Sequence, residues 1–316
     1  MTLLEESKVY RPMQYEWAET LRKTHEEIHW VAEEVELSED ITDWKLKLTE
    51  QEKDFVKHIL LLFTQSDVAV GGNYYNFIIP RIKNNEVRNM LGSFAAREAI
   101  HQEAYALLLD TLGMEDEHSK YLEFHEMYEK IDWMTTGHSN TQQGLALCLA
   151  QSTFNEGVAL FASFAMLLNF QRFGKMKGMS VVNQWSLRDE SIHVEGNAKI
   201  FRTLCAEHPR VVNDELKAQI YQMARDVAAL ENDFIDLVYK DYEIEGLSKN
   251  DLKIYIQYMA DRRLIQLGLK GNFGVKENPL PWMEHILSGN NHTNFFEARV
   301  TDYSVVGMTG DWEYGE

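Results

Sequence analysis

Two tetrads, Glu98-Ala-Ile-His101 and Glu190-Ser-Ile-His193, each lie in a long stretch whose apolar residues recur with helical spacing. On an α-helix, residues three positions apart project from the same face, so each tetrad directs a carboxylate and an imidazole towards one point. Four-helix bundles build two-metal centres from such pairs on two helices and from single carboxylates on two more. The tetrads therefore predict an all-α bundle around a dinuclear metal site.

Two other pairs, Glu26/His29 and Glu115/His118, have the same spacing but different surroundings. The first pair lies in a stretch rich in glutamate, and the second follows the helix-ending Gly113 in a polar string. The two tetrads of the predicted site instead share their helix faces with apolar and aromatic residues. We therefore expect both other pairs to be solvated rather than to bind metal.

Single acidic residues, Asp67 and Glu156, interrupt two further apolar stretches. A carboxylate that is buried without a partner is costly, and for either acid alone a salt bridge or a helix cap is the simpler explanation. A pair of metal ions explains all the acids and histidines together, and their oxygen-rich ligation favours Fe or Mn over Zn. The predicted metal ligands are Asp67, Glu98, His101, Glu156, Glu190 and His193.

The composition argues against several other classes of protein. A formal net charge of -19 opposes non-specific nucleic-acid binding, because like charges repel. The first six residues lack the basic start and apolar core of a signal peptide, and no uninterrupted apolar run of about twenty residues predicts a membrane span. Cys148 and Cys205 are isolated from each other and from any zinc-binding spacing. We therefore expect a reducing, cytoplasmic setting with neither a nucleic-acid nor a membrane partner.

The helical pattern has few breaks, with 5 prolines and 18 glycines among 316 residues. A capping box, Thr49-Glu-Gln-Glu52, is expected to open a helix that Gly71 and Gly72 loosen. Further helices are predicted over residues 85–112, 119–131, 141–173, 181–206, 212–241 and 249–269. We predict one helical domain over residues 1–290 and a mobile tail over residues 291–316.

Tyr105 lies seven residues after Glu98 and four after His101 on the same predicted helix face, where a metal centre could oxidise its phenol. With this tyrosine, the sequence resembles the small, radical-generating subunit of class I ribonucleotide reductase, which implies a ferritin-like helical bundle. The resemblance extends from about Arg11 to the tail. It is carried by Asp67, Glu98-Ala-Ile-His101-Gln-Glu-Ala-Tyr105, Phe154-Asn-Glu156 and Arg188-Asp189-Glu190-Ser-Ile-His193.

The resemblance implies that the six predicted ligands hold a dinuclear centre, as Fe/Fe, Mn/Mn or Mn/Fe. Activation by O2 or a reduced oxygen species, with or without an activating flavoprotein, would oxidise Tyr105 to a stable radical. The oxidising equivalent would then pass to a separate large catalytic subunit that reduces ribonucleotides to deoxyribonucleotides. The family also forms homodimers. The sequence agrees with this division of labour, because it has neither a glycine-rich phosphate loop nor a dithiol motif.

Trp30 and Asp189 match the family's electron route, which implies a hydrogen-bonded chain from the surface through the histidine of the first tetrad. In the tail, Tyr303 matches a tyrosine that relays the radical between subunits, and Tyr314 is a second candidate. Trp312, which lies between two acidic residues, resembles the end by which the small subunit docks on the large one.

The predicted pocket of Tyr105 has one unexpected polar residue. Leu160 and Phe164 follow Glu156 at helical spacing and are expected to keep water away from the phenol. Ser186 places a hydroxyl where an apolar residue is expected, one turn before the second tetrad. A hydroxyl at this position would make the pocket less dry, which would affect the lifetime or the identity of the radical.

Two other functions are compatible with parts of this pattern. A dimetal oxidase or hydroxylase acting on a small or lipid-like substrate would use the six ligands but would have no use for Trp30, Asp189 and Tyr303. Iron storage, or a purely structural bundle, would not require Tyr105 beside the metals. The radical-generating subunit is the interpretation that uses all of these residues.

Overall fold

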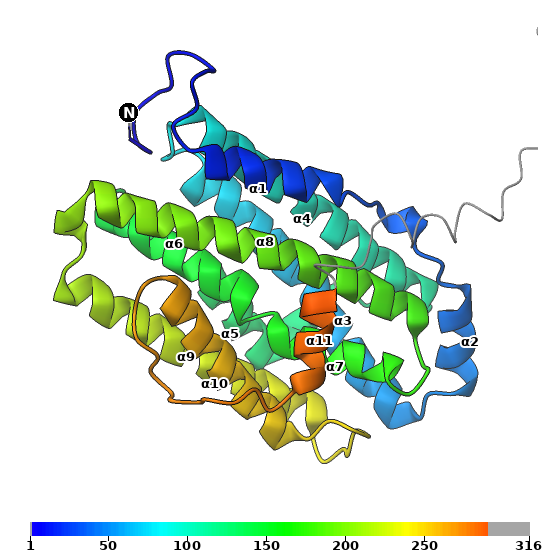
Figure 1. Ribbon diagram of the computed structural model, residues 1–316. Helices are drawn as coiled ribbons and strands as arrows, with labels where there is room; N and C mark the ends of the chain where they lie inside the picture. Colours follow the sequence, from blue (N-terminus) through cyan, green and yellow to red (C-terminus); the bar gives the residue numbers. More distant parts are fainter. Residues whose placement is uncertain (1, 290–316) are drawn as a thin grey trace, which may run out of the picture.

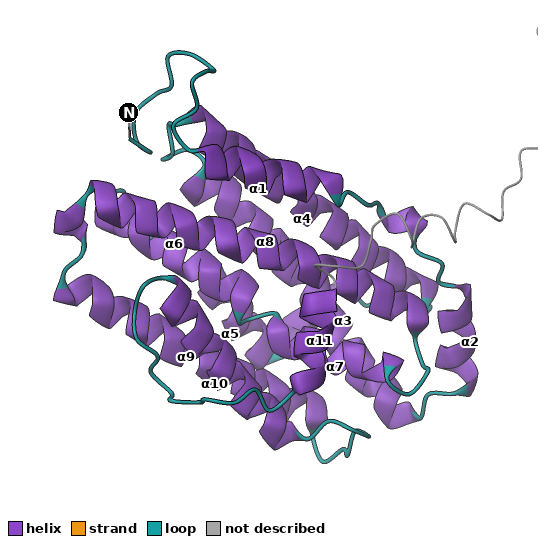
Figure 2. Ribbon diagram, viewed as in Figure 1, coloured by secondary structure: helices purple, strands orange, loops and turns teal. Residues whose placement is uncertain are grey.

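The computed structural model describes residues 2–289, and this part of the chain is helical throughout its regular structure (Figures 1 and 2). The only β pairing in the described residues is an isolated bridge between Ile244 and Leu247. The prediction of an all-α fold is therefore confirmed. The helices are α1 (Glu16–Glu27), α2 (Ser38–Leu46), α3 (Glu50–Asn73), α4 (Asn85–Thr111), α5 (His125–Met134), α6 (Gln142–Gly157), α7 (Phe161–Gln171), α8 (Lys177–Glu207), α9 (Asp214–Tyr239), α10 (Lys249–Gln266) and α11 (Pro281–Gly289).

Four long helices form the centre of the bundle. Helix α3 packs along α4, α6 packs along α8, and α4 also contacts α8. Helix α1 covers α4, whereas α9 and α10 cover α6 (Figure 1). Each of the four central helices carries at least one of the predicted metal ligands. The arrangement therefore brings residues that are far apart in the sequence to one point inside the bundle.

Helix α3 begins at the predicted capping box and runs past the two glycines. Thr49 Oγ1 accepts the backbone N–H of Glu52, and a carboxylate oxygen of Glu52 accepts the backbone N–H of Thr49. The expected loosening at Gly71 is wrong, because α3 stays regular to Asn73 and only then enters a π-helical turn. A Cβ atom at Gly71 would lie 3.3 Å from Cβ of Glu98. The glycine thus serves close packing of α3 on α4 rather than flexibility.

The apolar segment after residue 141 forms two helices, so the prediction of one helix over residues 141–173 is wrong. Helix α6 ends at Gly157, and α7 starts at Phe161. Arg263 of α10 explains the break, because its Nε donates to the carbonyl oxygen of Gly157 at 3.0 Å and its side chain occupies the place of a Cβ. The segment Gln142–Gln171 is apolar and long enough to cross a membrane, but its most apolar window is completely buried inside the protein.

The predicted helix over residues 119–131 is also divided. A 3-10 helix spans His118–Glu123, and α5 follows from His125. Helix α8, which carries the second tetrad, starts earlier than predicted. The carboxylate of Asp40 in α2 accepts the backbone N–H groups of Gly178 and Met179 at 2.7 and 2.8 Å. The N-terminus of α8 is therefore capped by a residue distant in sequence, which a local capping motif does not reveal.

A buried ion pair joins Lys130 of α5 to Glu231 of α9, and neither residue is one of the six predicted metal ligands. Burial raises the pKa of Glu231 to about 7, against the opposing effect of Lys130. We expect Lys130→Met to lower the free energy of unfolding by about 3 kcal/mol, because it leaves a buried carboxyl group without its partner. The double variant Lys130→Met/Glu231→Leu should recover most of this loss. Urea unfolding measures both, and equal losses in the two variants would contradict the prediction.

Candidate metal centre

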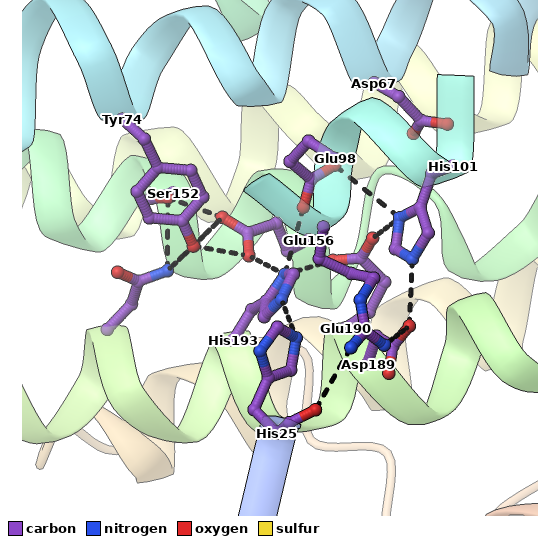
Figure 3. Close-up of polar contacts among 12 residues, drawn as sticks. His25, Asp67, Tyr74, Glu98, His101, Ser152, Glu156, Asp189, Glu190 and His193 are labelled. Atoms are coloured by element: carbon purple, nitrogen blue, oxygen red, sulfur yellow. Dashed lines mark hydrogen bonds and ion pairs between the residues drawn. The ribbon is translucent and has the colours of Figure 1, made fainter. Parts of the chain in front are cut away.

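The six predicted ligands converge from the four central helices. Asp67 comes from α3, Glu98 and His101 from α4, Glu156 from α6, and Glu190 and His193 from α8; all six are buried. Figure 3 shows their side chains pointing towards one another. The side chains form two overlapping groups, within each of which the potential ligand atoms lie no more than 4.8 Å apart. The groups are Asp67, Glu98, His101 and Glu190, and Glu98, Glu156, Glu190 and His193.

Glu98 and Glu190 belong to both groups, so two of the carboxylates lie between two potential metal positions. On one side, His193 Nδ1 lies 3.0 Å from Glu98 Oε1 and 3.2 Å from Glu156 Oε2. On the other side, His101 Nδ1 lies 3.2 Å from Glu190 Oε1. This geometry is that of two adjacent sites that share carboxylates.

Several inward-facing ligand atoms have no hydrogen bond of acceptable geometry within residues 2–289. They are Asp67 Oδ2, both carboxylate oxygens of Glu98 and of Glu190, and Nδ1 of His101 and of His193. Buried polar atoms without partners are rare in native proteins, so a clustered set requires a cation or protons. Carboxylate oxygens and imidazole nitrogens are the donor set that suits Fe or Mn. The residues present therefore fit a dinuclear metal centre.

The electrostatics of the cluster show how the metal-free protein balances its charges. Burial would lower the pKa of both His101 and His193, but the close contact of each imidazole with the surrounding carboxylates raises it well above its usual value. Burial raises the pKa of Glu156 to about 7, although His193 opposes this rise. For Glu98, the two histidines outweigh burial and lower the pKa. Protons on the imidazoles thus supply the positive charge that metal ions would otherwise supply.

Asp189 lies at the centre of the predicted Trp30–Asp189–His101 chain. Its Oδ2 accepts Trp30 Nε1–H at 2.8 Å and Arg97 Nη1–H at 2.8 Å, and it lies 3.1 Å from His101 Nε2. Burial would raise the pKa of Asp189, but His101 and the Arg97 charge hold it well below the usual range. An ionised carboxylate on Nε2 fixes the His101 tautomer, so that Nδ1 faces the cluster.

His25 of α1 is a buried neighbour of the cluster that the sequence did not reveal. Its Nε2 lies 3.0 Å from His193 Nε2, and its Nδ1 lies 2.9 Å from Ser93 Oγ. Burial and the adjacent His193 lower the pKa of His25 to about 2, so it is neutral at physiological pH. A neutral His25 can accept the Nε2–H of His193 and leave His193 Nδ1 facing the carboxylates. The acidic residues around His25 gave no sign of this burial.

Tyr74 is a second unpredicted neighbour, and it holds Glu156. The phenolic O–H of Tyr74 donates to the Glu156 carboxylate, 2.9 and 2.8 Å from its two oxygens, and Ser152 Oγ donates to Oε1 at 2.6 Å. Asn197 Nδ2 lies 2.8 Å from the Tyr74 oxygen and 3.2 Å from Glu156 Oε1. The spacing offered a signal, because Tyr74 follows Asp67 by seven residues, as Tyr105 follows Glu98.

Tyr105 is buried beside the cluster, with an apolar wall on one side. Its ring stacks on Phe63 with centroids 4.4 Å apart, and Phe63 contacts Phe164 at 5.0 Å. Leu160 is also fully buried, in the segment that joins α6 to α7. Burial, followed by the charge of Asp67, raises the pKa of Tyr105 well above its usual value. The phenol therefore keeps its proton at physiological pH.

The other sequence-predicted residues lie elsewhere. Glu26, His29 and Glu115 are exposed, and His118 forms an ion pair with Asp110 at 2.8 Å, so neither pair contributes to the cluster. The three aromatic residues proposed for relay and docking lie outside the described part of the chain. They are Tyr303, Trp312 and Tyr314.

A family model and similar proteins of known family both match this chain over most of its length. The family model described as "Ribonucleotide reductase, small chain" matches residues 7–279. The probable ribonucleoside-diphosphate reductase small subunit 376L of Invertebrate iridescent virus 6 is 36% identical, over 99% of this chain and 98% of that protein. The match spans nearly the whole of both chains.

Solved structures show the same fold at lower identity. The ribonucleotide reductase R2 subunit of Clostridium botulinum superposes with a TM-score of 0.84 at 23% identity, over 91% of this chain and 94% of that chain. Dimanganese(II)-NrdF of Streptococcus sanguinis superposes with a TM-score of 0.78 at 18% identity, over 90% of this chain and 99% of that chain. The Rnr4 homodimer of Saccharomyces cerevisiae superposes with a TM-score of 0.74 at 21% identity, over 96% of this chain and 92% of that chain. These likenesses confirm the predicted ferritin-like helical bundle.

Proposed function

The chain belongs to the small-chain family of ribonucleotide reductase, and on that premise we propose that its buried cluster holds a dinuclear metal centre that generates a radical on Tyr105. The chain is thus the small subunit of a ribonucleoside-diphosphate reductase. The observation that carries the proposal is the pair of overlapping ligand groups that share Glu98 and Glu190. Shared carboxylates between adjacent positions suit two metal ions better than one.

The residues around the centre have separate tasks in this proposal. When bound, Fe or Mn activated by O2 or a reduced oxygen species supplies the oxidising power for the Tyr105 phenol. Phe63 and Phe164 exclude water from its ring, which protects a phenoxyl radical from quenching. His25 and Asp189 hold the two ligand imidazoles with Nδ1 towards the cluster. Tyr74 orients the Glu156 carboxylate.

The Trp30–Asp189–His101 chain is the proposed route by which the oxidising equivalent leaves the centre. Trp30 is buried and stacks on His101 with centroids 5.9 Å apart. The receiving protein is the large catalytic subunit, and we propose that residues 291–316 dock there through the Trp312 region. Tyr303, or alternatively Tyr314, would continue the relay. Activation by a flavoprotein, and a cytoplasmic location, also belong to this proposal.

A homodimer is the proposed assembly of the small subunit. Helices α3 and α4 lie side by side, and together with the π-helical turn after α3 they expose apolar or small residues, including Val68, Tyr75, Ala96 and Ala99. Such a face is suited to contact with a second copy of the chain, because it offers apolar surface for burial. The Saccharomyces cerevisiae neighbour was solved as a homodimer.

Metal loading followed by electron paramagnetic resonance (EPR) tests the proposed function. The metal-free protein is loaded aerobically with Fe(II), Mn(II) or both, and the metal content and radical yield are quantified. We expect a tyrosyl signal, and formation of deoxyribonucleotides only when a large subunit is added. Failure of any large subunit to support this reaction would refute the function.

Metal affinity should rise with pH through neutrality. The pKa of Glu156 is raised to about 7, and the pKa values of His101 and His193 are raised well above their usual value, so a metal ion must displace protons. Displacement of one proton weakens binding by about tenfold for each pH unit below the pKa of the group. Titration with Mn(II) between pH 6 and pH 8, with free Mn(II) measured by EPR, checks this expectation. A constant affinity over this range would contradict it.

A further inference from the structure

The phenol of Tyr105 is hydrogen-bonded to an amide of helix α8. Its O–H donates to Oδ1 of Asn183 at 3.2 Å. Asn183 is completely buried and lies seven residues before Glu190, on the helix face that carries the second tetrad. A buried amide oxygen requires a donor, and Tyr105 supplies it. The family resemblance gave Asn183 no role.

The orientation of the Asn183 amide is fixed by the helix itself. Its Nδ2 donates to the backbone carbonyl oxygen of Met179, one turn earlier, at 2.7 Å. Because the amide nitrogen is engaged there, Oδ1 is the atom that faces the phenol. Asn183 can therefore accept the Tyr105 O–H in one orientation only.

Ser186 adds a second polar group on the same side of Tyr105. It is buried one turn after Asn183, and its Oγ has no hydrogen bond of acceptable geometry within the described part of the chain. It nevertheless lies close enough to the phenol to oppose the rise in the pKa of Tyr105 that burial causes. The pocket is thus apolar where Phe63 stacks on the ring and polar where α8 faces the hydroxyl.

We infer that Asn183 is a positioning residue for Tyr105, which fixes the direction of the phenolic O–H and the rotation of the ring about its Cα–Cβ and Cβ–Cγ bonds. The stack on Phe63 limits the plane of the ring from one side, and the bond from the Tyr105 O–H to Asn183 fixes the remaining rotation together with the direction of the hydroxyl. The consequence for radical chemistry rests on the proposed function. The contact itself exists without metal and can be tested without it.

The first experiment examines the metal-free protein. Ultraviolet resonance Raman difference spectra, each taken against the corresponding Tyr105→Phe variant, report whether the Tyr105 phenol donates a hydrogen bond. We expect a donating phenol in the unmodified chain and loss of that signature in Asn183→Leu. Asn183→Asp, which keeps an oxygen acceptor at the same place, should restore it. The same spectrum for the unmodified chain and Asn183→Leu would overturn the inference.

The second experiment uses EPR of the metal-loaded, radical-containing protein. The hyperfine splitting from the two Tyr105 β-protons depends on the rotation of the ring, so Asn183→Leu should change it and Asn183→Asp should largely retain it. Asn169→Leu is the matched control, because Asn169 is also a buried asparagine bonded through Nδ2 to a backbone carbonyl, but it lies on α7. An unchanged splitting in Asn183→Leu would overturn the inference, because it would show that the rotation of the Tyr105 ring does not depend on Asn183.

The two experiments separate this inference from the proposed function. A wild-type protein without a tyrosyl signal would refute a radical on Tyr105, yet the Raman spectra of the metal-free protein would still decide the role of Asn183. If Asn183→Leu does not reach wild-type helicity by circular dichroism, Asn183→Ala replaces it as the variant without an acceptor.

Discussion

Tyr105→Phe is expected to abolish deoxyribonucleotide formation while leaving metal binding intact. Phenylalanine keeps the shape of the ring and its stack on Phe63 but has no O–H to oxidise. The variant should load metal with wild-type stoichiometry, show no tyrosyl EPR signal, and lose activity with the large subunit to the background of the assay. Metal analysis, EPR and the coupled reaction, carried out on the same sample, check all three results.

Tyr255→Phe is the matched control for this prediction. Tyr255 of α10 is likewise a completely buried tyrosine, and its hydroxyl has no hydrogen-bond partner among residues 2–289. Its replacement should leave the radical and the activity unchanged. Retention of activity in Tyr105→Phe, together with a mixed-valent metal signal, would instead place the oxidising equivalent on the metals.

Asp189→Asn is expected to lower both metal affinity and turnover, by about 10- to 100-fold, because the carboxylate that fixes His101 loses its charge. The change also leaves Arg97 buried beside a neutral group. Trp30→Phe should behave differently, since it removes the Nε1–H donor and part of the indole ring but leaves the Asp189 carboxylate beside His101. It should load metal and form the radical normally but fail to support turnover. Titration with Mn(II), EPR and the coupled assay distinguish the two variants.

Trp17→Phe provides the control for loss of an indole, because Trp17 lies on α1 in contact with Tyr15 and outside the Trp30–Asp189–His101 chain. It should leave metal affinity, radical yield and turnover unchanged. Normal turnover in Trp30→Phe would show that the oxidising equivalent does not leave through Trp30. Normal metal affinity in Asp189→Asn would show that the Asp189 charge is not needed to orient His101.

The alternative functions differ in how well they explain the structure. An oxidase or hydroxylase would use the six ligands, but it would have no need for the contacts of Asp189 with Trp30 and Arg97. A storage or structural bundle would not require a buried phenol stacked between Phe63 and the cluster. The match to the small-chain family over residues 7–279 also favours the small subunit of ribonucleotide reductase over both alternatives.

The residues whose spacing is set by a single helix could be predicted from the sequence. The i, i+3 relation within each tetrad and the i, i+7 relation of Tyr105 to Glu98 depend only on helix geometry, which the chain keeps. Asp67 and Glu156 could be selected because a lone acid in an apolar stretch is costly unless it has a partner. The two ligand groups in the folded chain contain these same residues.

Other features depend on contacts between helices, which the local sequence does not encode. His25 lies in a polar-looking stretch, and only the packing of α1 on α4 and α8 brings it to His193. The end of α6 depends on Arg263, which lies more than a hundred residues away. Asp40, as the cap of α8, is a third case. In each case, a side chain from a helix distant in the sequence forms a hydrogen bond with a group that has no partner in its own local motif.

The interruption between α6 and α7 has a mechanical consequence for the ligand beside it. Glu156 is the penultimate residue of α6, and the backbone after it leaves the helix at Val158 before α7 begins. Asp67, Glu98 and Glu190 instead lie within long, continuous helices. Three sides of the cluster are therefore stiff, whereas the fourth ends at a joint that Arg263 braces from α10. The joint lets the backbone at Glu156 shift with less disturbance of the bundle than at the other three acids, while Tyr74 and Ser152 keep hold of its carboxylate.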